Sequence, residues 1–249
     1  MLKRRLGLVL AAPLLLTPVS PAKAQTVEEV LAKYYEAIGG LDNWKEVEAM
    51  RLTGTLSVSM GVEAPFTLLR RRPNQFRIEF TFQGMTGVQS TDGETAWMLM
   101  PFTGQTTAQA MPEAAAKSFK EQADFDGLLV GWEEAGSQVE LLGKEEVGGS
   151  EAYKLKLTTE SGSVTYYFVD AESYLVTRIE STEPEQGEEV RSAESLGEYK
   201  AVGELLIPHL LEIESPSAPG ATQVLTIEKV ELNPELEEGV FSMPAGGTD

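Results

Sequence analysis

The chain has 249 residues, no cysteine, one histidine and a formal net charge of −19. Without cysteine it can form no disulfide, no thiolate metal site and no cysteine-linked lipid anchor. Its excess of acidic residues repels the phosphates of nucleic acids and of anionic lipid headgroups, which argues against nucleic acid binding and against adhesion to an anionic membrane surface.

Residues 1–24 have the three parts of a secretory signal: basic residues at positions 3–5, an apolar run from Leu6 to Leu16, and the small-x-small site Ala22-Lys23-Ala24. A membrane-spanning helix needs about 20 apolar residues, more than this run offers. We therefore expect export to the periplasm without a permanent membrane anchor; the alternative is an uncleaved anchor. Removal of residues 1–24 takes four basic residues and no acid, so the net charge falls from −19 to −23.

Cleavage after Ala24 is the first testable prediction. N-terminal sequencing of the periplasmic fraction should begin at Gln25, because the small side chains that signal peptidase requires end at Ala24. A chain that keeps Met1 in the membrane fraction would contradict both the cleavage and the expected location.

Residues 25–249 are expected to form one domain, since mainly β domains often reach this length and no repeat or linker divides the chain. Thr26 and Glu29 form a capping box that predicts a helix, which Gly39-Gly40 ends. A short second helix is expected from Asp42 to Glu48.

Beyond these helices the apolar period changes to two, which is typical of half-buried strands. The clearest alternation is Phe76, Ile78, Phe80 and Phe82, and Asp92-Gly93 favours a type I′ hairpin turn. We expect about ten or eleven strands, with 205–215 as a single one.

Two helical pieces interrupt the strands: one from Pro112 to about Ala123, and one from Phe125 to Glu134. So many antiparallel strands twist and curl, and the hollow that results must be filled. The predicted fold is mainly β with α: a half-open curved antiparallel β-barrel whose concave face is covered by helices. A two-sheet sandwich is the alternative.

Three segments resemble the LolA carrier family: Arg71-Arg72-Pro73-Asn74-Gln75-Phe76-Arg77, then Asp92-Gly93-Glu94-Thr95-Ala96-Trp97 with Pro101-Phe102 and Gln105, and finally Phe241-Ser242-Met243-Pro244. Met100 stands where the family usually has Asn before Pro-Phe, and residues 138–232 match in strand rhythm alone. The related receptor LolB shares this fold but is lipid-anchored, which the lack of cysteine excludes here.

The resemblance implies a LolA/LolB-like half-barrel with an apolar hollow under helices that move aside for acyl chains. It implies a periplasmic carrier of acylated lipoproteins or lipids in outer-membrane lipoprotein sorting. Its partners would be an inner-membrane release complex and an outer-membrane acceptor, and it would act as a monomer without a cofactor. An envelope sensor of the same fold, which binds such ligands without moving them, is the alternative.

Seven apolar residues on or near the strands around Asp92-Gly93 are candidates for the acyl cavity. They are Phe80, Phe82, Met85, Trp97, Met98, Met100 and Phe102. Methionine suits a surface that accepts flexible chains, but ordinary core packing is the default alternative for each residue. Trp97 and Met98 are adjacent, so in a strand they point to opposite faces.

Arg72 precedes Pro73, and the resemblance implies that the arginine at this position contacts the covering helices and tethers the lid. A solvated cation at a strand end is the alternative reading. The single histidine, His209, has no nucleophile motif such as Gly-x-Ser-x-Gly to support it. We therefore expect no enzymatic activity and no metal site.

Overall fold

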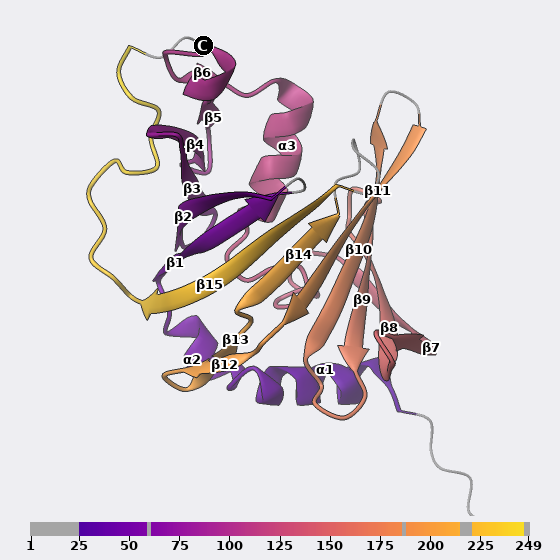
Figure 1. Cartoon of the computed structure of the whole chain (residues 1–249). Helices are drawn as coiled ribbons and strands as arrows, with labels where there is room; N and C mark the ends of the chain where they lie inside the picture. Colours follow the sequence, from indigo (N-terminus) through magenta and orange to yellow (C-terminus); the bar gives the residue numbers. More distant parts are fainter. Residues whose placement is uncertain (1–24, 59–60, 186–187, 215–220, 247–249) are drawn as a thin grey trace, which may run out of the picture.

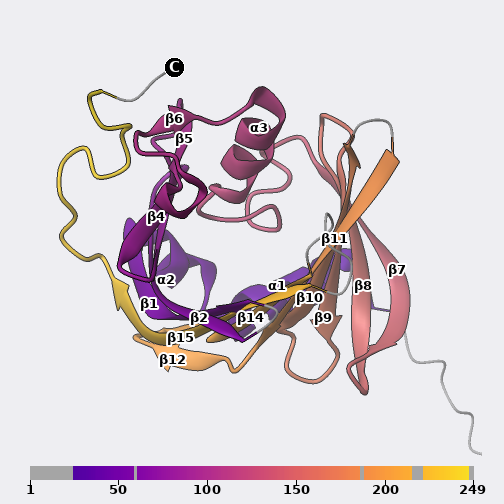
Figure 2. The same cartoon turned by 45° about the horizontal axis from the view of Figure 1, so that its top comes forward.

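The computed structural model describes residues 25–58, 61–185, 188–214 and 221–246. The predicted signal segment, residues 1–24, lies outside the described residues. The main feature is one antiparallel sheet of 13 strands, in the order β6-β5-β4-β3-β2-β1-β15-β14-β11-β10-β9-β8-β7. Figure 2 shows that the sheet curves into an open trough, so the predicted half-open barrel is confirmed.

The sheet has an N-terminal half, a C-terminal half and a seam that joins them. The N-terminal half comprises β1 (Ala49–Val58), β2 (Val62–Arg71), β3 (Gln75–Phe82), β4 (Met85–Thr91), β5 (Ala96–Leu99) and β6 (Gln109–Ala110). The C-terminal half comprises β7 (Gln138–Val147), β8 (Ser150–Thr158), β9 (Val164–Asp170), β10 (Val176–Glu185) and β11 (Glu188–Gly197). The seam is β14 (Leu210–Glu214) and β15 (Thr222–Leu232), which pair between β11 and β1.

The expected number of strands is too low for three local reasons. The single strand predicted over 205–215 is divided into β13 (Leu205–Ile207) and β14, because Pro208 has no N–H to donate to a neighbouring strand. β13 pairs with β12 (Lys200–Val202) in a separate hairpin. β6 has only two residues, too few for a visible period.

The predicted two-residue type I′ turn at Asp92-Gly93 is not present. The connection between β4 and β5 has four residues, and Asp92 Oδ1 accepts hydrogen bonds from the backbone N–H groups of Glu94 and Thr95.

The helices are α1 (Val27–Ala37), α2 (Leu41–Lys45) and α3 (Glu113–Gln122), with a 3-10 turn, η1, at Pro101–Thr103. The capping box of Thr26 and Glu29 is present at the start of α1. Figure 1 shows α1 lying across one end of the sheet. The predicted helix over Phe125–Glu134 is wrong: Gly127 and Gly131 adopt left-handed φ angles of +69°, and the segment forms turns.

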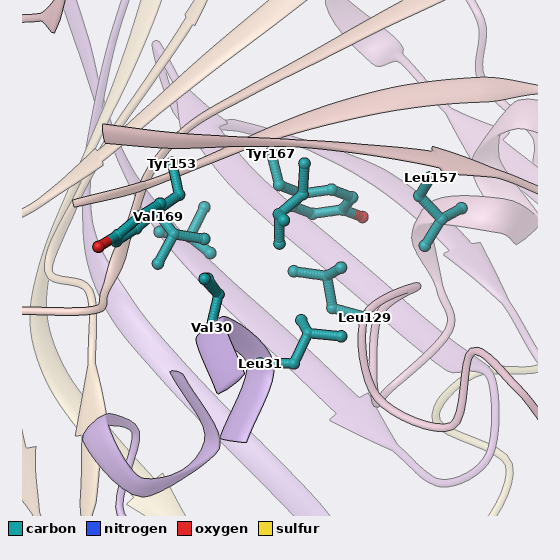
Figure 3. Packing of buried hydrophobic residues seen from close by; sticks show 9 residues of the cluster. Val30, Leu31, Leu129, Tyr153, Leu157, Tyr167 and Val169 are labelled. Carbon is teal, nitrogen blue, oxygen red and sulfur yellow. The ribbon is translucent and has the colours of Figure 1, made fainter. Parts of the chain in front are cut away.

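Within the described residues, three clusters of buried residues form the core, of which the smallest consists of Val88, Trp97 and Ala108 in the N-terminal half. The other two are larger. One joins α1 to the C-terminal half and consists of Val30, Leu31, Leu129, Tyr153, Leu155, Leu157, Tyr167, Val169 and Val176. The other joins α2, the β12–β13 hairpin and the N-terminal half, and consists of Val47, Met50, Leu52, Phe66, Phe125, Leu205, Ile207, Leu225 and Ile227. Figure 3 shows Val30, Leu31 and Leu129 pointing toward the strand residues of the first cluster.

The seam of the sheet depends on a close approach at Gly54, where the register between β1 and β15 shifts. A Cβ atom on Gly54 would lie 1.9 Å from the carbonyl oxygen of Thr226, so the backbone would have to move. We expect Gly54→Ala to lower the free energy of unfolding by about 1–3 kcal/mol in denaturant titrations, the usual cost of overpacking. Gly197→Ala is the matched control, because the nearest atom to its Cβ is 4.0 Å away. Equal losses in the two variants would contradict this explanation.

Candidate functional site

The register of the strands identifies the concave face of the trough. Arg70 is paired with Met50 on one side and Phe76 on the other, and the Phe76 ring lies 5.3 Å from the Phe119 ring of α3. Figure 2 shows α3 inside the curve of the sheet, so residues in the same register as Arg70 and Phe76 face inward. These inward residues are largely apolar in the N-terminal half: Met50, Leu52, Leu56, Phe66, Leu68, Ile78 and Phe80.

The apolar lining continues across the C-terminal half. Leu155 pairs with Tyr167, and Tyr167 pairs with Ile179, so all three share the inward face. Leu155 is fully buried and packs in the cluster that also contains Val30 of α1. The trough therefore has an apolar lining on both sides of its seam.

Residues 113–137, which we call the lid segment, cover this lining. The segment comprises α3 and the turns that follow it, and Figure 2 shows it within the curve of the sheet. Phe125 is 1% exposed and Leu129 is 3% exposed, so both side chains are buried against the trough. The Tyr35 hydroxyl of α1 donates to the Leu129 carbonyl at 2.5 Å. The structure is thus a closed form in which protein side chains occupy the trough.

Arg72 holds one end of the lid segment in place. Its Nη1 lies 2.5 Å from Asp126 Oδ2, while its Nε and Nη2 donate to the carbonyls of Val47 at 2.7 Å and Trp44 at 3.0 Å. The indole nitrogen of Trp44 donates to the other oxygen of Asp126 at 2.7 Å. A guanidinium with five donors can make all of these contacts at once, and it thereby ties the lid segment to α2.

Arg70 makes a second attachment to the lid segment. Its Nη2 donates to the carbonyls of Gln122 and Asp124, at the C-terminal end of α3 where helix carbonyls lack partners. The guanidinium carbons of Arg70 and Arg72 lie 5.6 Å and 4.5 Å from the centre of the Phe125 ring. Arg70 Nε is buried and has no hydrogen-bond partner.

One acidic residue, Glu194, lies on the concave face among apolar neighbours. It is paired across β11 with Ile179 of β10 and Ile213 of β14. Burial raises the pKa of its carboxyl, and the charge of Arg70 opposes that rise. Burial likewise raises the pKa of Asp124 on the lid segment. The closed trough therefore contains a small cluster of charged groups in apolar surroundings.

We expect Glu194→Gln to raise the thermal midpoint at neutral pH, because it removes a carboxylate whose charged form is penalised by burial. The pKa of Glu194 is raised in the folded state, so its charge lowers the free energy of unfolding only where the carboxyl is ionised. This loss of stability is absent below the usual glutamate range, about pH 4, and complete above the pKa of the folded state. Melting curves should therefore differ most at neutral pH and converge as the pH falls toward about 4. A constant difference, or the same gain from Glu63→Gln at an exposed position, would contradict this account.

The predicted cavity residues are not all in one place. Phe80, Phe82, Met85 and Met98 belong to the inward register of β3, β4 and β5. Phe102 lies near them, with its ring 5.5 Å from that of Phe80, and Met100 precedes η1. Met85 is 38% exposed, which places it at the rim.

Trp97 requires a correction, because it points to the convex face. It pairs with Ser90, and both side chains donate to the carbonyl of Phe241, at 2.8 Å and 2.9 Å. Phe241 belongs to residues 233–246, which Figures 1 and 2 show, in yellow, running along the outside of the N-terminal half. Trp97 is therefore an anchor for the C-terminal segment and not a cavity residue.

The sequence analysis missed Arg70, Phe125, Leu155 and Tyr167. The alternation in β8 and β9 placed Leu155 and Tyr167 on strands, but a period of two does not say which face is concave. Arg70 was visible only as part of a basic run. Arg70 lies two residues before Arg72, in the inward register of β2. This position indicates a contact with the lid segment, but only when it is known which face of β2 the lid segment covers.

A hollow of about 700 Å³ borders α3. The described residues that line it are Glu113, Ala114, Ala116, Lys117, Lys120 and Glu121. Alanine and charged side chains do not make an apolar surface for an acyl chain, so we base the candidate site on the lining of the trough.

The described parts of the chain offer little other site chemistry. His209 is buried, and its Nδ1 lies 2.9 Å from the Ile207 carbonyl. Within the described ranges no cluster of histidine and acidic residues is arranged to hold a metal ion. None of the helices in the same ranges has the length and apolar character of a membrane span.

Comparison with known proteins identifies relatives of the fold. A family model with the description "uncharacterized protein" matches residues 83–245. No curated protein matches the sequence.

Three solved structures cover most of the chain. A DUF1329 family protein from Desulfovibrio piger has a TM-score of 0.62 at 13% identity, covering 88% of this chain and 98% of that one. A LolA superfamily protein from Nitrosomonas europaea has a TM-score of 0.59 at 14% identity, with coverage of 88% and 98%. A putative outer membrane lipoprotein-sorting protein domain from Vibrio parahaemolyticus has a TM-score of 0.58 at 11% identity, with coverage of 86% and 95%.

Proposed function

Because this chain belongs to a LolA-like family, we propose that it is a periplasmic carrier that binds acyl chains of lipoproteins or lipids in its trough. The observation that carries the proposal is an apolar lining that continues across the seam and is covered by one separate segment, residues 113–137. An acyl chain gains about 0.8 kcal/mol for each methylene removed from water, so a carrier in an aqueous compartment needs such a surface.

The energies of closing the lid and of binding a ligand are of similar size. Burial of Phe125 and Leu129 contributes about 1.5–3 kcal/mol each, and a charge-assisted hydrogen bond of Arg72 contributes about 1.5–3 kcal/mol. An acyl chain with a dozen buried methylenes would gain about 10 kcal/mol. A long chain can therefore displace the lid segment, whereas a short one cannot.

Displacement of a fluorescent fatty-acid probe tests this proposal. With the mature protein, ligands of increasing chain length but the same headgroup should displace the probe with affinities that rise steeply with each added methylene. A flat dependence on chain length would mean that the trough is a permanently packed core, and the carrier proposal would fail.

The same proposal includes the finer role in outer-membrane lipoprotein sorting, with an inner-membrane release complex and an outer-membrane acceptor as partners. It includes no catalytic step, since the one histidine is buried with its Nδ1 beside the Ile207 carbonyl. Mass spectrometry of lipids incubated with the protein should recover them unchanged. Release of free fatty acid or headgroup in proportion to protein concentration would overturn this part.

A further inference from the structure

Opposite charges meet where the lid segment is attached to the sheet. Two cations, Arg70 on β2 and Arg72 in the turn after it, contact the part of the lid segment that contains the acids Asp124 and Asp126. The ion pair between these cations and acids is that of Arg72 with Asp126, at 2.5 Å, in which the side chains are only 17% and 32% exposed. Opening of the lid separates these opposite charges.

The open trough would keep the cations without their lid partners. Arg72 would retain the carbonyls of Trp44 and Val47 but lose Asp126, and Arg70 would lose the carbonyls of Gln122 and Asp124. A guanidinium left without an anion in apolar surroundings is costly. Glu194 faces Arg70 from the sheet, and burial in the closed form raises the pKa of its carboxyl. Among the described residues it forms no ion pair with either arginine, so it does not replace the pair that Arg72 forms with Asp126. The open state therefore favours a ligand that brings an anion.

The lid segment itself resembles such a ligand. Asp124-Phe125-Asp126 places a carboxylate on each side of a buried ring that lies over both guanidinium groups. The buried Nε of Arg70 has no partner in the closed form, so one donor remains for an oxygen that the lid does not supply. Carboxylates and phosphates accept two parallel hydrogen bonds from a guanidinium.

We propose, on the premise of the acyl-carrier function, that the preferred ligand is an acidic amphiphile. Its carboxylate or phosphate takes the place of the lid oxygens, which are the Asp126 carboxylate at Arg72 and the carbonyls of Gln122 and Asp124 at Arg70. Its acyl chain takes the place of Phe125 and Leu129. The trough thus selects for an acidic headgroup as well as for chain length, and a neutral acyl lipid is the weaker ligand.

Calorimetric titration of the mature protein with hexadecanoate, hexadecyl phosphate and hexadecanol tests the headgroup at constant chain length. We expect both anions to bind at least about tenfold more tightly than the alcohol, the lower end of a charge-assisted hydrogen bond. In Arg70→Met this ratio should fall toward one, and in Arg70→Lys it should be partly kept. Arg51→Met, on the outer face beside Glu231, should keep the wild-type ratio. Circular dichroism confirms that each variant is folded.

The outcomes separate this inference from the function on which it rests. Equal affinity of the alcohol and the anions would overturn the headgroup selection and leave the acyl carrier intact. Tight binding of acetate or inorganic phosphate alone would also overturn it, because the site would then recognise a free anion. If none of the three long-chain ligands binds, the proposed function itself fails.

Discussion

Phe125→Ala is expected to release the lid segment from the trough while the curved sheet stays folded. Phe125 is 1% exposed, its ring lies 5.8 Å from that of Trp44, and both Arg70 and Arg72 stack on it. Truncation of a buried phenylalanine costs about 3–5 kcal/mol, more than any single polar contact of the lid. Hydrogen exchange should therefore accelerate across residues 113–137 and remain slow in β8 and β9.

Phe241→Ala is the matched control for this prediction. Phe241 is also buried, at 2% exposed, and also lies under an arginine, Arg71, but it packs on the convex face. Its removal should accelerate exchange in residues 233–246 and not in the lid segment. If Phe125→Ala unfolds the whole chain cooperatively, the lid is an integral part of the core and the idea of a separable cover is wrong.

Arg72→Leu is expected to shift the protein toward the open form without removing apolar surface. The variant loses the pair with Asp126 and the hydrogen bonds to Trp44 and Val47. A loss of about 1.5–3 kcal/mol corresponds to an opening equilibrium about 10–150 times larger. Exchange of lid amides should rise by a similar factor, and an acyl probe should be retained longer.

Arg51→Leu is the control for Arg72→Leu, since Arg51 pairs with Glu231 on the outer face and is remote from the lid segment. Arg70→Leu is unsuitable as a control, because Arg70 donates to the carbonyls of Gln122 and Asp124. The tether must be abandoned if Arg72→Leu and Arg51→Leu change lid exchange equally.

The strands and the class of fold could be predicted because their signals are local. Alternation such as Phe76-Ile78-Phe80 follows from the pleat, and the capping box at Thr26 is complete within four residues. The predicted anchoring arginine, Arg72, does contact the lid segment, although through the carboxylate of Asp126. The carbonyls that it binds belong to Trp44 and Val47, outside the lid.

The faces of the strands and the path of the lid could not be predicted, because both depend on contacts between distant residues. Trp97 was placed with Met98 although a strand points them apart. The pairing of β5 with β4 and the contact with the C-terminal segment around Phe241 show that Trp97 faces outward. The apolar run at Leu128-Leu129-Val130 suggested a helix. In the structure it forms turns between Gly127 and Gly131 and is held by tertiary packing of Leu129.

Photo-crosslinking with a diazirine-bearing long-chain fatty acid tests the central claim most directly, because it reports where the acyl chain lies. The account predicts cross-links in peptides that contain the concave residues Phe66, Leu155 and Tyr167 and in the lid segment, with all of them suppressed by an unlabelled long-chain competitor. Cross-links concentrated on the outer segment 233–246, or unaffected by the competitor, would contradict it.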